Sequence, residues 1–412
     1  MELMTPFPLP LADLFGHWGA YVVYLFIGLA FGAVLELAGF GNSKKLAAQF
    51  YFQDMTVLKV MFTGIIVAMV LIFAASALGW VDYNLLWVNP TYLWPGIIGG
   101  LIMGVGFIVG GFCPGTSLVA AATLKKDGIF FVLGVFTGIF LFGETVDSFA
   151  VFWNSSYLGR YTLPEMFGLP TGVVVLGVVL MAIGMFWASE KLEQKYGGKD
   201  PQKAPRWRYF AAAGIFLFAV FVLIMGQPTL EDRWQQIASQ REAVLLAREV
   251  QIHPGELLDS IHDNSLKVMM LDVRDEVDYN QFHILDSRHV PLEELPTIIE
   301  DLHFQPANTV FVTMSNDEGA ATEAWKLLQA ESVPNVYILE GGINNWIATF
   351  GDDDLTKNYN AGAGDDELCY IFDSAIGSRY AAAEPDPHAQ ELPYLPKIVL
   401  ELKRAPTSGG CG

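Results

Sequence analysis

Six long apolar stretches constrain this chain more than any other feature of its sequence. They cover about residues 18–40, 56–81, 93–112, 128–150, 170–189 and 208–226. Each is long enough to cross the hydrocarbon core of a bilayer, which takes about 20 residues of helix. Of all 412 residues, 52% are hydrophobic, which is more than an ordinary soluble domain has. The first part of the chain is therefore predicted to be a polytopic α-helical membrane domain.

Charge divides the chain into two halves. Residues 1–227 hold 12 Lys and Arg against 12 Asp and Glu, and residues 228–412 hold 12 against 32, so the whole net charge of −20 lies in the second half. A strongly acidic soluble domain argues against binding to nucleic acid or to anionic lipid headgroups. We predict a membrane domain at 1–227, a helical linker at 228–245, a soluble domain at 246–352 and an irregular acidic tail at 353–412.

Basic residues indicate how the membrane domain is oriented. Arg160 alone flanks one side of the predicted spans, and the other side has Lys44, Lys45, Lys59, Lys125, Lys126, Lys191, Lys195, Lys199, Lys203, Arg206 and Arg208. Because basic loops stay in the cytoplasm, both termini and the soluble half are expected on the periplasmic side of a bacterial inner membrane. Residues 1–17 contain no Lys or Arg, so we expect no cleaved signal peptide.

The membrane domain contains an internal repeat, over about residues 20–81 and 93–150. GFGNSKK at 39–45 aligns with GFCPGTS at 111–117 at an offset of 72 residues, and FTGI at 62–65 aligns with FTGI at 136–139 at an offset of 74. Repeats of an apolar helix, a broken segment and a second apolar helix are typical of transporters, whose sites form where the repeats meet.

Each broken segment predicts a short helix. Pro114 suits the first turn of a helix over 114–124, whose N–H groups and positive dipole end would point at Cys113. Thr116 and Ser117 can bond the free donors there, and such a corner favours an anion. A small buried packing residue is an equally good interpretation of Cys113. In the first copy, Asn42 and Ser43 can cap a matching helix over 43–53, and Gly41 replaces the cysteine.

Two acidic residues fall inside the apolar stretches. Glu36 lies just before the first break, where we expect it to cap the break or to pair with Lys44 or Lys45. Glu144 lies in the fourth stretch, and acidic residues at membrane depth usually line a cavity or have a partner. Glu144 is therefore the better functional candidate.

Several segments of the membrane domain resemble the YeeE/YedE sulfur-transport family. They are GFGNSKKLAAQFYFQDMTVLK at 39–59, TYLWPGIIGGLIMGVGFIVGGFCPGTSLVA at 91–120, FGE at 142–144 and TLPEMFGLPTG at 162–172. The resemblance covers nearly all of residues 20–195. It implies a transporter or channel that moves thiosulfate or a related sulfur anion past cysteines in Gly-rich loops. The implied substrate contacts are Gly111, Cys113, Pro114, Gly115, Thr116, Ser117, Gly41, Asn42 and Glu144, with Gly41 standing where the family commonly has another cysteine.

The second half alternates strands and helices, which implies a mainly parallel α/β sheet. Strands are predicted at 267–274, 310–313 and 336–339, a helix at 319–331, and an amphipathic helix at 229–249 ahead of them. LDVRDEVDYNQFHI at 271–284, the strand, loop and helix at 310–328, and LEGGINNW at 339–346 resemble a rhodanese domain over roughly residues 246–352.

A rhodanese carries its nucleophilic cysteine just after the central strand, and the resemblance fails at that point. The loop here is MSNDEG at 314–319, which puts Ser315 at the cysteine position, or Met314 if the alignment slips by one. Serine alone is too weakly acidic for persulfide chemistry. Of the other loop residues, which are Asn316, Asp317, Glu318 and Gly319, the two acids would repel thiosulfate. We expect a catalytically inactive domain that docks a partner protein of sulfur metabolism or gates the pore, with Asp272 and Arg274 paired within its fold.

The remaining cysteines leave two alternatives open. Cys411, in a Gly-rich end, is either a sulfur carrier or, as we favour, an incidental thiol; Cys369 is expected to be a packing residue, and the two can pair. The alternatives to a transporter are a membrane-anchored sulfurtransferase that uses Cys411 or Cys369, and a non-transporting membrane subunit of a sulfur-metabolising complex. We expect no enzyme activity, no cofactor and no metal.

Overall fold

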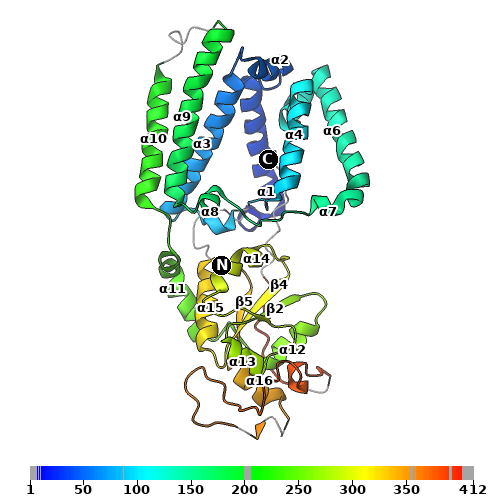
Figure 1. The fold of residues 1–412 in the computed structure, drawn as a ribbon, viewed down its shortest axis with the longest axis vertical. Coiled ribbons are helices and arrows are strands. Elements are labelled where there is room, and N and C mark those ends of the chain that lie inside the picture. Colours follow the sequence, from blue (N-terminus) through cyan, green and yellow to red (C-terminus); the bar gives the residue numbers. More distant parts are fainter. Residues whose placement is uncertain are drawn as a thin grey trace. The chain divides into compact units, whose positions relative to one another are not determined.

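The computed structural model describes residues 7, 9, 11–86, 88–198, 206–352, 356–357, 359–388 and 392–400. The chain folds into two compact units, of which the first runs to Gln227 and the second begins at Pro228. The first unit is helical and the second is α/β (Figure 1). Cys411, together with the whole of 401–412, lies outside the described residues.

Among the described residues, six helices are long and apolar enough to cross a membrane. Their spans are Leu14–Leu37, Thr56–Ala77, Leu93–Ala122, Lys126–Trp153, Thr171–Tyr196 and Trp207–Met225. Each overlaps one of the apolar stretches in the sequence, so the predicted spans are confirmed. The elements that form them are α1 (Leu11–Leu37), α3 (Thr56–Ala77), α4 (Leu93–Gly110), α5 (Pro114–Ala122), α6 (Lys126–Thr145), α7 (Ala150–Trp153), α9 (Thr171–Tyr196) and α10 (Trp207–Met225).

The long helices are interrupted at both places where the repeat predicts a break. Between α1 and α3 lie the short helix α2 (Ser43–Ala47) and the 3₁₀ segment Ala48–Tyr51, in place of one helix over 43–53. Between α4 and α6 lies α5, which confirms the predicted helix over 114–124. A further short helix, α8 (Leu163–Phe167), precedes α9.

Helices α3, α9 and α10 form one packed group, side by side in Figure 1. Its core contains Ile66, Val70 and Ala74 of α3, Val175, Val179 and Ala182 of α9, and Ala219 and Val222 of α10. A buried polar contact joins α3 to α9, since Glu193 accepts a hydrogen bond from Met55 N at 2.7 Å and pairs with Lys59. The other faces of the spans expose large apolar side chains such as Leu101, Ile102 and Phe130, as a lipid-facing surface requires.

The second unit contains a five-stranded, all-parallel sheet with strand order β1-β5-β4-β2-β3. The strands are β1 (Gln251–Ile252), β2 (Lys267–Asp272), β3 (Arg288–His289), β4 (Thr309–Met314) and β5 (Val336–Leu339). The central strand β4 is buried along its whole length, and Thr313 lies opposite Leu271 of β2 and Ile338 of β5. The three predicted strands are confirmed, whereas β1 and β3 cannot be predicted because two residues show no periodicity.

Helices flank this sheet, four on the connections between strands and one after the last strand. They are α12 (Pro254–His262), α13 (Glu276–Gln281), α14 (Leu295–His303), α15 (Gly319–Ala330) and α16 (Gly342–Phe350). The predicted helix over 319–331 is α15. The amphipathic helix expected at 229–249 is α11 (Leu230–Leu246), which packs on α15 through an edge contact between Trp234 and Trp325.

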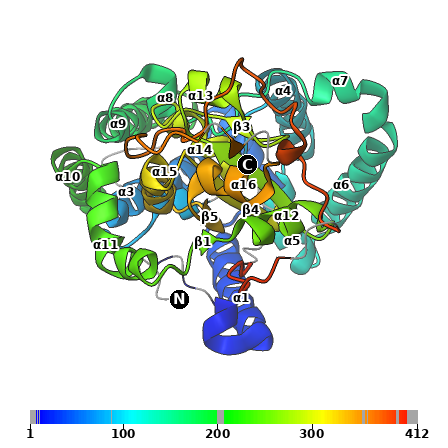
Figure 2. The ribbon, with the colours of Figure 1, turned by 90° about the horizontal axis from the view of Figure 1, so that it is seen from below.

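The acidic tail, predicted to be irregular, packs on the sheet unit in its described part. Tyr370, Ala382 and Ala383 are buried in the same core as the sheet. Trp346 Nε1 donates to Ala382 O at 2.7 Å, which holds the tail beside α16 (Figure 2). Cys369 is partly buried against this core, as expected for a packing residue.

Candidate functional site

The corner at Cys113 has the local geometry that its sequence predicts. α4 ends at Gly110, Gly111 takes the left-handed conformation with φ 71°, and Cys113 is the N-cap of α5. Cys113 Sγ accepts a hydrogen bond from Thr116 N at 3.4 Å, and Cys113 N donates to Thr116 Oγ1 at 3.0 Å. Ser117 Oγ bonds Pro114 O at 2.7 Å. The thiol therefore lies at the positive end of α5, next to Pro114 and Gly115.

The first corner repeats this backbone without the thiol. Gly39 has φ 82°, against 71° at Gly111, and Phe40 and Phe112, which follow these glycines, are each 1% exposed. Asn42 caps α2 as predicted, since its Oδ1 accepts from Lys44 N at 3.1 Å. The glycine turn and the buried phenylalanine of the sequence repeat thus recur in both corners, although the helix cap falls one residue later in the first copy.

The two corners meet, although they are far apart in the sequence. Ser43 Oγ of the first corner donates to Asp127 Oδ2 at the start of α6, at 2.7 Å. A Cβ atom at Gly111 would lie 3.1 Å from Ser43 O, so the backbones themselves are close. The two copies of the repeat therefore meet around Ser43, Gly111 and Asp127.

An ion pair also joins the corners. Glu36 Oε1 at the end of α1 lies 3.0 Å from Lys125 Nζ, which follows α5. The expected pairing of Glu36 with Lys44 or Lys45 is wrong, because Lys45 Nζ instead donates to Ala38 O at 2.7 Å. Gly41 lies directly against the Glu36–Lys125 pair.

Glu144 is not brought to this junction. It lies in the last turn of α6, while the junction is at the first turn of that helix, around Asp127. Its side chain is exposed on the helix surface.

In the α/β unit, the loop after β4 is closed. Ser315 is fully buried. Its hydroxyl oxygen accepts from Ala321 N at 3.1 Å, and its carbonyl oxygen accepts from Ile343 N at 2.9 Å. A Cβ atom at Gly342 would lie 2.0 Å from Asp317 O, so the loop backbone is in close contact with the start of α16.

Two carboxylates occupy the backbone N–H groups of this loop. Asp366 of the tail accepts from Asp317 N at 2.9 Å and from Ala320 N at 2.6 Å. Asp317 in turn accepts from Gly319 N at 2.7 Å and from Asp366 N at 2.8 Å. Burial tends to raise the pKa of the Asp317 carboxyl, but the backbone hydrogen bonds from Gly319 and Asp366 outweigh it and lower that pKa overall. The loop N–H groups of Asp317, Gly319 and Ala320 therefore already donate to carboxylates of the protein and are not free to bind another anion.

The mouth of the loop is acidic. An open hollow of about 550 Å³ is lined by Asp317, Glu318, Gly319, Thr322, Glu323 and Gly341. Glu318 accepts from Gly341 N at 2.8 Å and pairs with Arg248 at 2.7 Å, a contact that raises the pKa of the Arg248 guanidinium. The Arg248 cation is therefore already neutralised by carboxylates.

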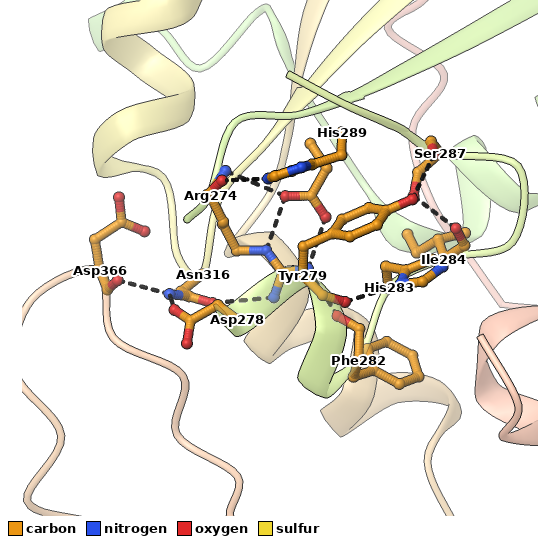
Figure 3. A network of polar contacts seen from close by, with 11 residues as sticks. Arg274, Asp278, Tyr279, Phe282, His283, Ile284, Ser287, His289, Asn316 and Asp366 are labelled. Atoms are coloured by element: carbon orange, nitrogen blue, oxygen red, sulfur yellow. Dashed lines mark hydrogen bonds and ion pairs between the residues drawn. The ribbon is translucent and has the colours of Figure 1, made fainter. Parts of the chain in front are cut away.

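A buried polar network lies behind the loop (Figure 3). Arg274 donates to both carboxylate oxygens of Asp272, at 2.9 and 2.6 Å, which confirms the expected pairing. Arg274 Nη1 reaches Asn316 Oδ1 at 3.2 Å, and Asn316 Nδ2 donates to Asp278 Oδ2 at 2.6 Å and to Asp366 O at 2.8 Å. The guanidinium thus holds the loop and the tail in place from inside the fold.

No local sequence pattern marks Lys125, Asp127 or Asp366 as site residues. Along the chain, Lys125 is one of many basic flanking residues and Asp366 is part of an acidic run. Within the described parts of the chain, no group of three or more His, Cys, Asp or Glu side chains is arranged to hold a metal ion.

Two family models match the chain. The sulphur transport model matches residues 38–244, just over half of the chain, and the rhodanese-like domain model matches residues 253–349. Both agree with the resemblances that the sequence segments show. Among curated proteins, none matches the chain.

Proposed function

This chain belongs to the sulphur transport family, and we propose on that ground that it carries thiosulfate or a closely related sulfur anion across the membrane. It is a multi-pass membrane protein with a rhodanese-like domain. The observation that supports the proposal is the junction of the two repeat corners, where Gly111, two residues before Cys113, lies against Ser43 of the first corner.

We propose that Cys113 contacts the passing anion and does not attack it. The end of α5 presents a partial positive charge, and an S–H group is a weak hydrogen-bond donor. Weak contacts suit a transport site, because a substrate must leave as readily as it enters. Gly111, Pro114, Gly115, Thr116 and Ser117 shape the second corner, Gly41 and Asn42 shape the first, and Glu144 would act at a different depth.

We further infer that the rhodanese-like domain is catalytically inactive. No cysteine occurs between residues 253 and 349. Burial of Ser315 and occupation of the loop N–H groups by Asp317 and Asp366 support this inference. Its proposed role is docking of a protein partner or gating of the pore.

The basic residues around α2, α5 and the end of α9 favour a cytoplasmic location for that side of the membrane unit. We therefore propose a bacterial inner-membrane protein with its α/β unit in the periplasm. Protease added to intact spheroplasts should digest the α/β unit, and a fully protected unit would reverse this orientation.

Uptake of labelled thiosulfate into proteoliposomes tests the transport proposal. Wild-type protein should exceed empty vesicles, and Cys113→Ala should lower uptake by about tenfold, equivalent to roughly 1.4 kcal/mol of lost contact. Cys369→Ala is the matched control, since Cys369 is a partly buried cysteine of the other unit, and it should transport like the wild type. Wild-type uptake equal to that of empty vesicles would refute the proposal for thiosulfate.

A second assay tests the inactive domain. The purified chain should transfer no sulfane sulfur from thiosulfate to cyanide above background. Appreciable transfer would contradict the inference and would favour a membrane-anchored sulfurtransferase.

A further inference from the structure

The Glu36–Lys125 pair occupies the place of a missing thiol. We infer that the Lys125 ammonium replaces this thiol as the anion contact of the first corner, with Glu36 as its exchangeable counterion. This inference rests on the proposed function, because it assigns a further substrate contact to the same transport site.

The equivalence of positions 41 and 113 is structural as well as sequential. Each follows a left-handed glycine and a fully buried phenylalanine. Cys113 is itself the N-cap of α5, whereas Gly41 lies one residue before Asn42, the N-cap of α2. A side chain at Gly41 would therefore lie at the first corner, one residue further from the start of the short helix than Cys113 at the second corner.

That position is filled from elsewhere in the chain. A Cβ atom at Gly41 would lie 2.3 Å from Glu36 Oε2 and 2.7 Å from Lys125 Nζ. A side chain at 41 and the ion pair in this location thus exclude one another. The charged ends of Glu36 and Lys125 stand where the first thiol would be.

The pair is open enough to exchange its partner. The side chains of Lys125 and Glu36 are 37% and 40% exposed, whereas those of Lys59 and Glu193 are 27% and 8% exposed. Glu193 is also fixed by the Met55 backbone N–H. The Lys125 pair is thus the more exposed of the two, and its carboxylate has more freedom to leave its partner.

The chemistry of the pair suits a sulfur anion. An ammonium is a compact point charge with three donors, so it can bind an oxyanion without a fixed geometry. Lys125 is neutralised by Glu36, whose oxygens lie 3.0 and 3.4 Å from Nζ. An entering dianion must compete with this carboxylate, so Glu36 should weaken binding and aid release.

Four variants in the thiosulfate uptake assay test the inference. Lys125→Gln should raise KM about tenfold or more, because a charge-assisted contact with the anion is lost. Lys125→Arg should stay within about threefold of wild type, because it keeps the charge. Glu36→Gln should lower KM, because the competing carboxylate is gone.

The double variant Glu36→Gln with Lys125→Gln distinguishes anion binding by Lys125 from a purely structural role of the ion pair. If the pair only holds the corners together, each single variant leaves a charge unpaired and the double variant should recover transport. If Lys125 binds the anion, the double variant should have a KM as high as that of Lys125→Gln. Recovery in the double variant would overturn the inference.

Lys126→Gln is the matched control, since it removes the same charge from the next, exposed residue and should leave KM unchanged. Elution of each variant as a single peak in size-exclusion chromatography checks that it is folded. Wild-type protein without uptake would refute the proposed function itself. Wild-type uptake with an unaltered KM for Lys125→Gln would refute only the role of Lys125.

Discussion

Asp366 offers the most direct test of how the rhodanese-like loop is closed. Its carboxylate accepts hydrogen bonds from Asp317 N and Ala320 N, at 2.9 and 2.6 Å. Asp366→Asn keeps the shape and one acceptor oxygen, but it removes the charge and turns an amide N–H₂ toward a backbone donor. The loop should therefore open more often in this variant.

The size of the effect follows from these two bonds. A hydrogen bond to a charged group contributes about 1.5–3 kcal/mol and a neutral one about 1 kcal/mol. Replacing two charged bonds by one neutral bond therefore costs about 2–5 kcal/mol. The lower end of this range applies because Asp366 is half-buried and partly screened by water. A loss of about 2–3 kcal/mol in the free energy of local opening corresponds to roughly 30- to 150-fold more frequent opening.

Hydrogen exchange followed by mass spectrometry measures this opening in the full chain in detergent. Peptides that cover 315–321 should exchange about 30-fold faster or more in Asp366→Asn than in the wild type, because local opening controls their exchange. Asp365→Asn, the same change at an exposed neighbouring residue, is the control and should leave the exchange unchanged. Equal exchange rates in wild type and Asp366→Asn would refute the argument that this carboxylate holds the loop.

Three further predictions concern the α/β unit. Arg274→Met leaves the buried Asp272 carboxylate without its partner and should destabilise the unit by about 3–5 kcal/mol in pulse proteolysis. Gly342→Ala places a Cβ 2.0 Å from a backbone oxygen at φ 59°, which should cost about 3 kcal/mol or more and make the unit protease-sensitive at lower temperature. Burial and the hydrogen bond to Asp259 raise the pKa of Tyr394 to about 12 from its ordinary value of 10.0. The stabilisation by its neutral phenol is complete below pH 10 and is lost as the pH rises through 12. The 295 nm absorbance difference between wild type and Tyr394→Phe should show this phenol ionising at about pH 12.

The two stability predictions have controls in the same unit. Lys326→Met breaks an exposed ion pair with Glu323 and should change stability by less than about 0.5 kcal/mol. Gly362→Ala meets nothing closer than 3.5 Å and should be nearly neutral. An Arg274→Met or Gly342→Ala variant as stable as its control would contradict the packing described for the loop.

Features that depend on neighbouring residues could be predicted from the sequence. The six spans follow from runs of apolar residues, and α5 follows from Pro114 and the Thr116 that completes its cap. Strands β2, β4 and β5 have enough consecutive apolar residues to be recognised, and the buried Asp272–Arg274 pair lies two residues apart in the sequence.

Features that depend on contacts between residues far apart in the chain could not be predicted from the sequence. Lys44 and Lys45 are the cations nearest to Glu36 along the chain after the break, but the fold brings Lys125 to it across 89 positions. The role of Asp366 likewise depends on a tail that returns to the loop 49 positions earlier. Neither contact has a local pattern, because charge pairing is decided by which backbones the packing brings together.

The exclusion between a side chain at Gly41 and the Glu36–Lys125 pair has a consequence for related chains. Relatives that carry a cysteine at the position of Gly41 should not also keep an acid and a lysine at the positions of Glu36 and Lys125 in this arrangement. The three positions should therefore covary across the family, even though 36 and 125 belong to different copies of the repeat. Such covariation would divide the family into members with two thiols at the junction and members with one thiol and one ion pair.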